Sequence, residues 1–204
     1  MTTLLVTGFG PFPGAPFNPT AALVRRLARL RRPALADVKL IAHVFPTSYA
    51  AVDHELPKLM AEYKPDALLM FGLATRAKRL RVEQRARNAI ALLADVQSAT
   101  PHRHAIAPGA PYALPLRAPA HRLTGAIRAA GLPVTLSQDA GSYLCNYLCW
   151  RAAEAGPRLA AFVHVPKVRR HPRPCGAKRR RLTVNDLARA GERLLMEVLA
   201  AARR

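Results

Sequence analysis

The sequence predicts an α/β protein, a single-domain three-layer α/β/α sandwich with an open, mainly parallel, twisted sheet. Short apolar runs of strand length alternate with amphipathic stretches of helix length along the chain. A length of 204 residues with 50% hydrophobic residues suits one domain with a sizeable core. The sequence contains no internal repeat and no sign of a second domain, so residues 1–204 are expected to form one unit.

The N-terminal part of the chain reads as a βαβαβ unit. The expected strands are residues 3–8, 38–45 and 66–72, and the expected helices are residues 18–30 and 48–63. Asn18 or Thr20 begins the first helix, and Pro57 is expected to bend or restart the second. Consecutive βαβ units favour a parallel sheet that helices cover.

The rest of the chain is less regular. Polar and apolar residues alternate from Arg79 to Asn88, which predicts a half-exposed strand or hairpin with arginines on one side. Residues 95–119 are expected to be mainly loop. Helices are then expected near 118–130, over 142–156 and from 183 onward, with strands at 132–137 and 159–165. Residues 167–181 are basic and broken by prolines, so a mobile loop is expected there.

Charge and composition indicate the class of partner and the compartment. The chain has 32 Lys and Arg against 12 Asp and Glu, a formal net charge of +20 that attracts nucleic acid. Such binding is expected to be non-specific, because aromatic residues do not interleave with the basic ones. No stretch approaches the roughly 18 apolar residues of a membrane span, and no secretory signal is recognisable. A cytoplasmic protein with no membrane partner is therefore expected.

The loop after the first expected strand, "GFGPFPG" at residues 8–14, has glycines that suggest a phosphate site. The spacing is GxGxxxG rather than GxGxxG, and Pro11 and Pro13 remove two amide donors, so a nucleotide is disfavoured. What remains is Phe9 and Phe12 on a stiff loop at the C-terminal end of a strand, where α/β folds bind ligands. The two rings form either an apolar wall or a plug on the core.

Three residues are candidates for nucleophilic catalysis. Cys145 is expected in or near the first turn of a helix, where free amides and the helix dipole favour a thiolate. His164 lies near the end of a later strand, and strand ends of a parallel sheet share one edge, so the two side chains can meet. Glu83 either orients the imidazole or pairs with Arg81 or Arg85. A buried inert thiol and a satisfied core histidine are the alternatives.

These residues resemble the pyroglutamyl peptidase I (pyrrolidone-carboxylate peptidase) family of cysteine peptidases. Four stretches match in order: "VTGFGPF" with "NPT", Gly72 followed by "EQRARN", "AGSYLCN" and "FVHVP". The resemblance implies an open α/β/α sandwich and removal of an N-terminal pyroglutamyl (5-oxoproline) residue from peptides, without a metal or cofactor. It implies that Cys145 is the nucleophile, His164 its base and Glu83 the orienting acid.

The resemblance also implies a substrate pocket in which the two loop phenylalanines hold the lactam ring. The substrate-binding residues that it suggests are Phe9, Phe12, Asn18, Thr47, Leu73, Tyr143 and Leu144. Leu73 is a departure, because the family usually has a glutamine there whose amide helps to recognise the lactam. Arg76 and Ala77 stand where the family has a Gly-Arg pair. Both departures bear on specificity rather than on the catalytic class.

Two other functions remain open at this point. One is an amidase of the same fold that acts on another small acyl group. The other is a nucleic-acid-binding or scaffold protein on a disabled peptidase fold, supported by the arginine face at residues 79–87 and the basic run 178–181. A homo-oligomer also remains open, because the family includes monomers and tetramers.

Overall fold

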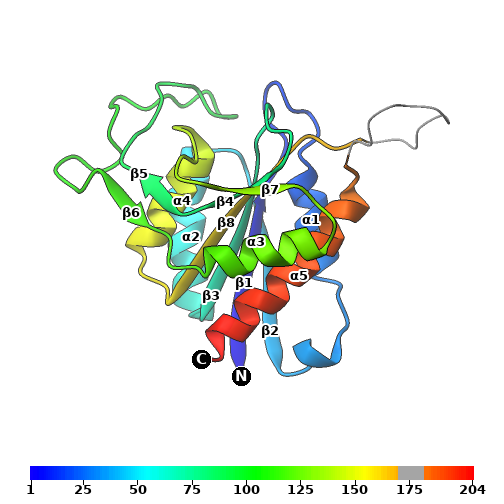
Figure 1. Cartoon of the computed structure of the whole chain (residues 1–204). Coiled ribbons are helices and arrows are strands. Elements are labelled where there is room, and N and C mark those ends of the chain that lie inside the picture. Colours follow the sequence, from blue (N-terminus) through cyan, green and yellow to red (C-terminus); the bar gives the residue numbers. More distant parts are fainter. Residues whose placement is uncertain (170–181) are drawn as a thin grey trace, which may run out of the picture.

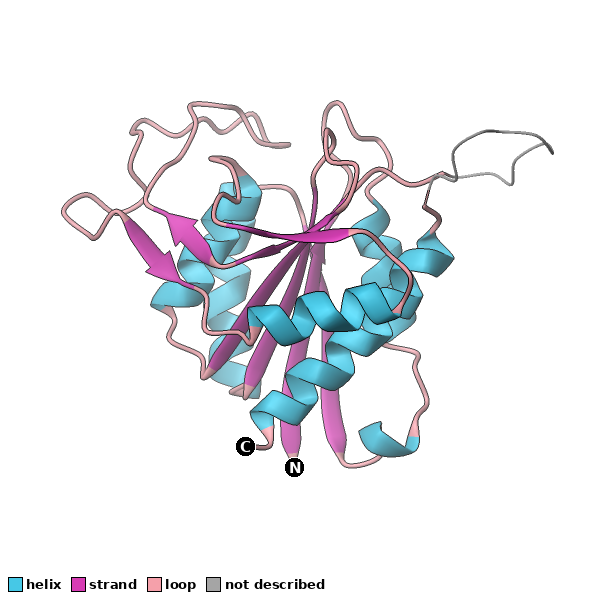
Figure 2. Cartoon of the chain, viewed as in Figure 1, coloured by secondary structure: helices cyan, strands magenta, loops and turns pink. Residues whose placement is uncertain are grey.

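The structure, a computed structural model, describes residues 1–169 and 182–204 and contains one central sheet with helices on both faces (Figures 1 and 2). The sheet has six strands in the order β2-β1-β3-β8-β4-β7. They are β1 (Thr2–Phe9), β2 (Val38–Phe45), β3 (Ala67–Leu73), β4 (Leu80–Glu83), β7 (Val134–Ser137) and β8 (Leu159–Val165). The predicted three-layer α/β/α architecture is confirmed. Most of the predicted basic loop, residues 170–181, lies outside the described residues.

The helices form two layers, each with its own apolar core. One face of the sheet is covered by α1 (Pro19–Leu27), α3 (Ala120–Ala129) and α5 (Val184–Ala202). The other face is covered by α2 (Tyr49–Tyr63) and α4 (Leu144–Glu154). Every residue of β3 is buried, because a strand covered on both faces has no polar side. A short 3₁₀ helix, η1 (Pro33–Leu35), precedes β2.

Capping residues mark the starts of α1 and α5, and a proline lies inside α2. Asn18 caps α1, with Pro19 at its first position, and Thr183 forms a capping box with Asp186 at the start of α5. α2 runs through Pro57 as one helix, so the expected restart there is wrong, whereas the alternative, a bend at Pro57, stays a prediction. No helix among the described residues is long and apolar enough to cross a bilayer.

The segment from Arg79 to Asn88 differs from the single half-exposed strand or hairpin that the sequence predicts. It forms β4, which lies between β8 and β7 inside the sheet, and then β5 (Arg85–Arg87), which pairs with β6 (Ala113–Pro115) as a separate antiparallel ribbon. The predicted alternation is present, since Leu80 and Val82 pack in the core with α1, α3 and α5. On the other side Arg81 is half-buried and Glu83 is 1% exposed, because β4 has a neighbouring strand on each side.

Candidate active site

Cys145 is the second residue of α4, in the first helical turn as the sequence predicts. Gly141 has a left-handed φ of +86°, which lets the chain turn sharply before the helix. Tyr143, the N-cap residue, makes no side-chain capping bond, and the first turn contains no acidic residue. The amides at this helix end are therefore oriented to bind a negative charge beside the cysteine.

The Cys145 sulfur rests on the backbone of β3. A methyl group built onto Gly72 would lie 2.6 Å from Sγ and 2.6 Å from Cζ of Phe162, which is far inside van der Waals contact. Gly72 is also the register partner of His164 on β8. The glycine therefore provides the space that brings the sulfur down to the ends of β3 and β8, next to the imidazole.

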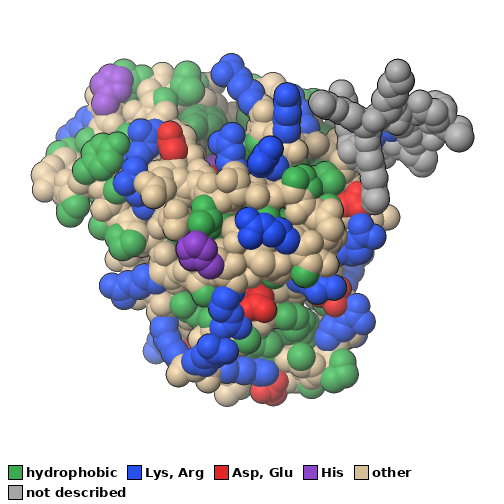
Figure 3. Space-filling view, in the orientation of Figure 1, with side chains coloured by type: hydrophobic (Ala, Val, Ile, Leu, Met, Phe, Trp, Pro, Cys, Tyr) green, Lys and Arg blue, Asp and Glu red, His purple; other side chains and the backbone are tan. Residues whose placement is uncertain are grey.

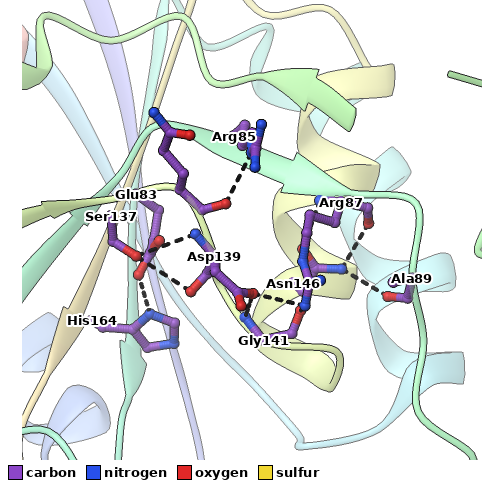
Figure 4. Close-up of polar contacts among 10 residues, drawn as sticks. Glu83, Arg85, Arg87, Ala89, Ser137, Asp139, Gly141, Asn146 and His164 are labelled. Atoms are coloured by element: carbon purple, nitrogen blue, oxygen red, sulfur yellow. Dashed lines mark hydrogen bonds and ion pairs between the residues drawn. The ribbon is translucent and has the colours of Figure 1, made fainter. Parts of the chain in front are cut away.

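The imidazole of His164 pairs with the carboxylate of Glu83. The distance from Nδ1 to Oε1 is 2.8 Å, and both side chains are buried (Figure 4). Glu83 is the register partner of Phe162, two residues from His164, so the carboxylate approaches the imidazole diagonally across the β4–β8 ladder. Among the described residues, Glu83 forms no ion pair with Arg81 or Arg85, the alternative that the sequence left open.

Charges around His164 favour its protonated form. Burial lowers the pKa of the imidazole, but the negative charge of Cys145 and then the Glu83 carboxylate outweigh this effect and raise the pKa to about 9. Cys149, one turn further along α4, is completely buried, and burial raises the pKa of its thiol well above the ordinary value. Cys145 and Cys149 are therefore distinguished by their surroundings.

The loop after β1 places its two phenylalanines differently. Phe9 is 2% exposed and packs against Phe45, with ring centroids 6.0 Å apart. Phe12 is half-buried on a tight turn closed by two backbone hydrogen bonds with Ala15, of 3.2 and 2.8 Å. Gly14 has a φ of +82° in that turn. Phe9 thus belongs to the core under the loop, whereas Phe12 is held on the loop itself.

Asn18 and Thr47 hold this loop through one carbonyl group. The Asn18 Nδ2 donates to the Gly10 carbonyl oxygen at 3.0 Å, and the Thr47 hydroxyl donates to the same oxygen at 3.2 Å. Each of the two side chains is 3% exposed. In this structure both residues position the loop that carries Phe12.

The sequence and the fold of the chain both match known proteins. The sequence model described as "Pyroglutamyl peptidase" matches residues 2–172. The chain belongs to the pyroglutamyl peptidase family. The resemblance inferred from the sequence is thereby confirmed.

Relatives and solved structures of this family align over most of their length. A pyrrolidone-carboxylate peptidase of Pyrococcus furiosus is 32% identical over 171 residues, 81% of each chain. One from Thermococcus onnurineus is 31% identical over 204 residues, covering 97% of this chain and 99% of the relative. The solved pyrrolidone carboxyl peptidase of Thermococcus litoralis has a TM-score of 0.86 at 28% identity, covering 100% of this chain and 96% of the other.

Two contacts hold Tyr143, which lies two residues before Cys145. Its hydroxyl donates to the Ala94 carbonyl at 2.9 Å, and its ring meets Tyr49 edge-on at 5.9 Å. The buried Asp95 accepts hydrogen bonds from three backbone amides, including that of Tyr49. Burial acts to raise the pKa of Asp95, but these bonds hold it below the ordinary value. The sequence did not single out Asp95.

The remaining predicted pocket residues of this family member are apolar. Leu73 is the last residue of β3 and is 7% exposed, and Leu144, the first residue of α4, is 1% exposed. Both therefore contribute to the core around the site.

Asn146 is a second residue that the sequence analysis did not assign, although it follows the cysteine directly. Its side chain is buried and makes three hydrogen bonds: the Arg87 amide donates to Oδ1, and Nδ2 donates to the carbonyls of Arg87 and Ala89. These bonds tie the start of α4 to β5, as Figure 4 shows. The asparagine fixes the helix that carries Cys145.

Two arginines of the predicted basic face serve the same turn. The Arg87 guanidinium lies 2.8 Å from the Asp139 carboxylate and donates to the Gly141 carbonyl at 3.2 Å. Arg85 donates to the Gln138 carbonyl at 3.0 Å. Arg85 and Arg87 therefore hold the turn before α4. From the sequence alone, these arginines were also candidates for binding phosphate.

Proposed function

We infer that this protein is a cysteine-type omega peptidase that removes an N-terminal pyroglutamyl residue from peptides by acyl transfer. The main supporting observation is the position of Cys145 at an uncapped helix start, against Gly72 and beside the buried His164–Glu83 pair. Family membership supplies the substrate class. The catalytic roles of Cys145, His164 and Glu83 are our assignment.

Acylation begins when the Cys145 sulfur attacks the carbonyl carbon that joins the pyroglutamyl group to the next residue. The carbonyl oxygen becomes negatively charged and is stabilised by backbone amides of the first turn of α4. His164 holds its Nδ1 on Glu83, so its other nitrogen, Nε2, donates a proton to the leaving amine. The carbon–nitrogen bond breaks, the shortened peptide departs and a thioester remains.

Deacylation reverses the direction of proton transfer. His164, now neutral, accepts a proton from a water molecule whose oxygen attacks the thioester carbon. The carbon–sulfur bond breaks, pyroglutamate is released and the Cys145 thiolate is restored beside the imidazolium. Apart from this water molecule, both steps use only groups of the chain itself.

The substrate pocket is assigned to the space between the Phe12 loop and Tyr143. A pyroglutamyl group has no charged α-amino group, so apolar and aromatic walls suit it. With an apolar Leu73 at the end of β3, hydrogen bonds to the lactam ring are left to backbone groups. Asn18 and Thr47 support recognition by fixing the Gly10 carbonyl and hence the loop.

We place this reaction in the reducing cytoplasm, because the nucleophile acts as a free thiol. All three assigned catalytic residues come from one chain, so the chemistry does not require a second copy. Binding to nucleic acid is assigned no part in it.

The deciding experiment measures release of aminomethylcoumarin from its pyroglutamyl amide. Cys145→Ala and Cys145→Ser are expected to lower kcat/KM by about 10³-fold or more, because the thioester cannot form. Cys149→Ala is the matched control and keeps the wild-type rate. Activity that survives in Cys145→Ala would exclude the assignment. Cys145-dependent release from another acyl amide, with none from the pyroglutamyl amide, would instead show an amidase with a different substrate.

A further inference from the structure

Arg81 occupies a position beside the catalytic pair that the mechanism does not use. In the antiparallel β4–β8 ladder it is the register partner of His164. Directly opposed residues place their side chains on the same face of a sheet, with Cβ atoms about 5 Å apart. Glu83 lies two residues further along β4, on the same face as Arg81, and its carboxylate contacts His164. Arg81 therefore lies on the active-site face of the sheet.

The Arg81 guanidinium is not committed to another group. Its side chain is half-buried, and among the residues that the structure describes it forms no hydrogen bond or ion pair. The nearest acid on the same strand face, Glu83, is already paired with His164. By contrast, Arg85 and Arg87 bind the turn before α4. A half-buried, unpaired arginine beside a catalytic centre is available to a ligand.

The order of the strands shows which part of a substrate Arg81 would meet. Phe12 follows β1 and Leu73 ends β3, so the assigned acyl pocket lies on that side of the sheet. Cys145 sits at the ends of β3 and β8, and β4 is the next strand beyond β8 (Figure 1). Because His164 on β8 donates the proton to the leaving amine, the leaving residue extends across β8 toward β4.

We propose that Arg81 binds a carboxylate on the leaving residue, so that this enzyme prefers pyroglutamyl substrates with a carboxylate close to the scissile bond. This inference rests on the proposed function. The carboxylate is either the free C-terminus of a pyroglutamyl dipeptide or an acidic side chain on the first leaving residue. A guanidinium suits both, because its parallel N–H groups match the two oxygens of a carboxylate.

The test compares kcat/KM for three substrates in which a carboxylate replaces one carboxamide: the neutral pyroglutamyl-glutamine amide, pyroglutamyl-glutamine and pyroglutamyl-glutamate amide. For the wild type we expect one or both carboxylate substrates to exceed the neutral amide by about 3- to 10-fold, as for a partly exposed charge pair. The second substrate reports a C-terminal carboxylate and the third an acidic side chain. Raising the salt concentration should reduce the preference.

Substitutions then assign the preference to one residue. Arg81→Gln should bring the ratio of carboxylate to neutral substrate to about 1, whereas Arg81→Lys should keep part of it. Arg128→Gln removes the same charge from an exposed site on α3, on the opposite face of the sheet, and should keep the wild-type ratio. Arg79→Gln tests the exposed arginine just before β4 in the same way.

Four outcomes would overturn the proposal. A wild type without preference, or a preference that persists in Arg81→Gln, excludes Arg81 as a carboxylate ligand. An equal fall on all three substrates in Arg81→Gln would show that the arginine acts on the His164–Glu83 pair instead. If the wild type leaves pyroglutamyl aminomethylcoumarin intact, the proposed function fails, and this inference fails with it. Cleavage of that amide without carboxylate preference removes this inference alone.

Discussion

At the scale of single residues, the protonation of His164 depends on two neighbours that substitution can separate. Its pKa, raised to about 9, means that the imidazolium is available through neutral pH and is lost as the pH rises through about 9. The alkaline limb of the activity profile should therefore report this group. The same shift stabilises the folded state fully below pH 6.5, and this contribution is lost as the pH rises toward 9.

Glu83→Gln tests how far the Glu83 carboxylate contributes to the raised pKa of His164. The variant should move the alkaline limb of kcat/KM to lower pH, because a neutral amide no longer favours the imidazolium. The measurement is a rate profile from pH about 6 to 10 with pyroglutamyl aminomethylcoumarin. Glu55→Gln is the control, since Glu55 lies 2.6 Å from His43 and forms another Glu–His pair, on α2 and β2. An unmoved limb in Glu83→Gln would remove Glu83 from the catalytic group.

Gly72→Ala tests the close contact between Gly72 and the Cys145 sulfur. The new methyl group would meet both Sγ of Cys145 and the Phe162 ring, so the sulfur must shift. A displacement of about 1 Å at a reacting atom costs about 10²-fold in kcat/KM. In the control, Gly125→Ala, the methyl group meets no heavy atom within 4 Å beyond its neighbouring residues and the backbone of its own helix, α3. That change should leave kcat/KM alone and stabilise the helix by about 0.5–1 kcal/mol in urea unfolding.

At the scale of elements, the N-terminus of α1 and the loop before it are one unit. Asn18 both caps the helix and holds the Gly10 carbonyl, so Asn18→Ala should lower the free energy of unfolding by about 1–2 kcal/mol and raise KM for the pyroglutamyl amide. Thr183→Ala removes a cap of similar kind from α5 and should cost similar stability at unchanged KM. If both variants had the same KM, the loop held by Asn18 would have no role in substrate binding.

The elements also show what sequence patterns can and cannot predict. The βαβαβ unit was predictable because its strands are unbroken apolar runs between capped helices. The direction of β4 was not, because alternation indicates which face a residue occupies but not which strand pairs with it. Cys145 and His164 were predictable as candidates from their places at a helix start and a strand end. Asn146 was missed because its partners are backbone groups 57 and 59 positions away.

At the scale of the whole molecule, the formal net charge of +20 attracts nucleic acid, although the proposed reaction makes no use of such binding. Lys and Arg side chains are spread over the face in Figure 3 rather than confined to one patch. We expect weak binding to duplex DNA of any sequence at about 50 mM salt and release at about 300 mM. Fluorescence anisotropy with two unrelated duplexes measures this. Tight binding to only one of them at the higher salt would contradict it.

The place of β8 has a consequence for how the protein is made. This strand inserts between β3 and β4, although it follows both in the chain, and it carries His164. A nascent chain that has not yet emerged as far as Leu159 therefore lacks His164, the base of the proposed mechanism, and the strand that joins the two halves of the sheet. Under the proposed mechanism, peptide hydrolysis begins only after β8 has been synthesised and has paired with β3 and β4.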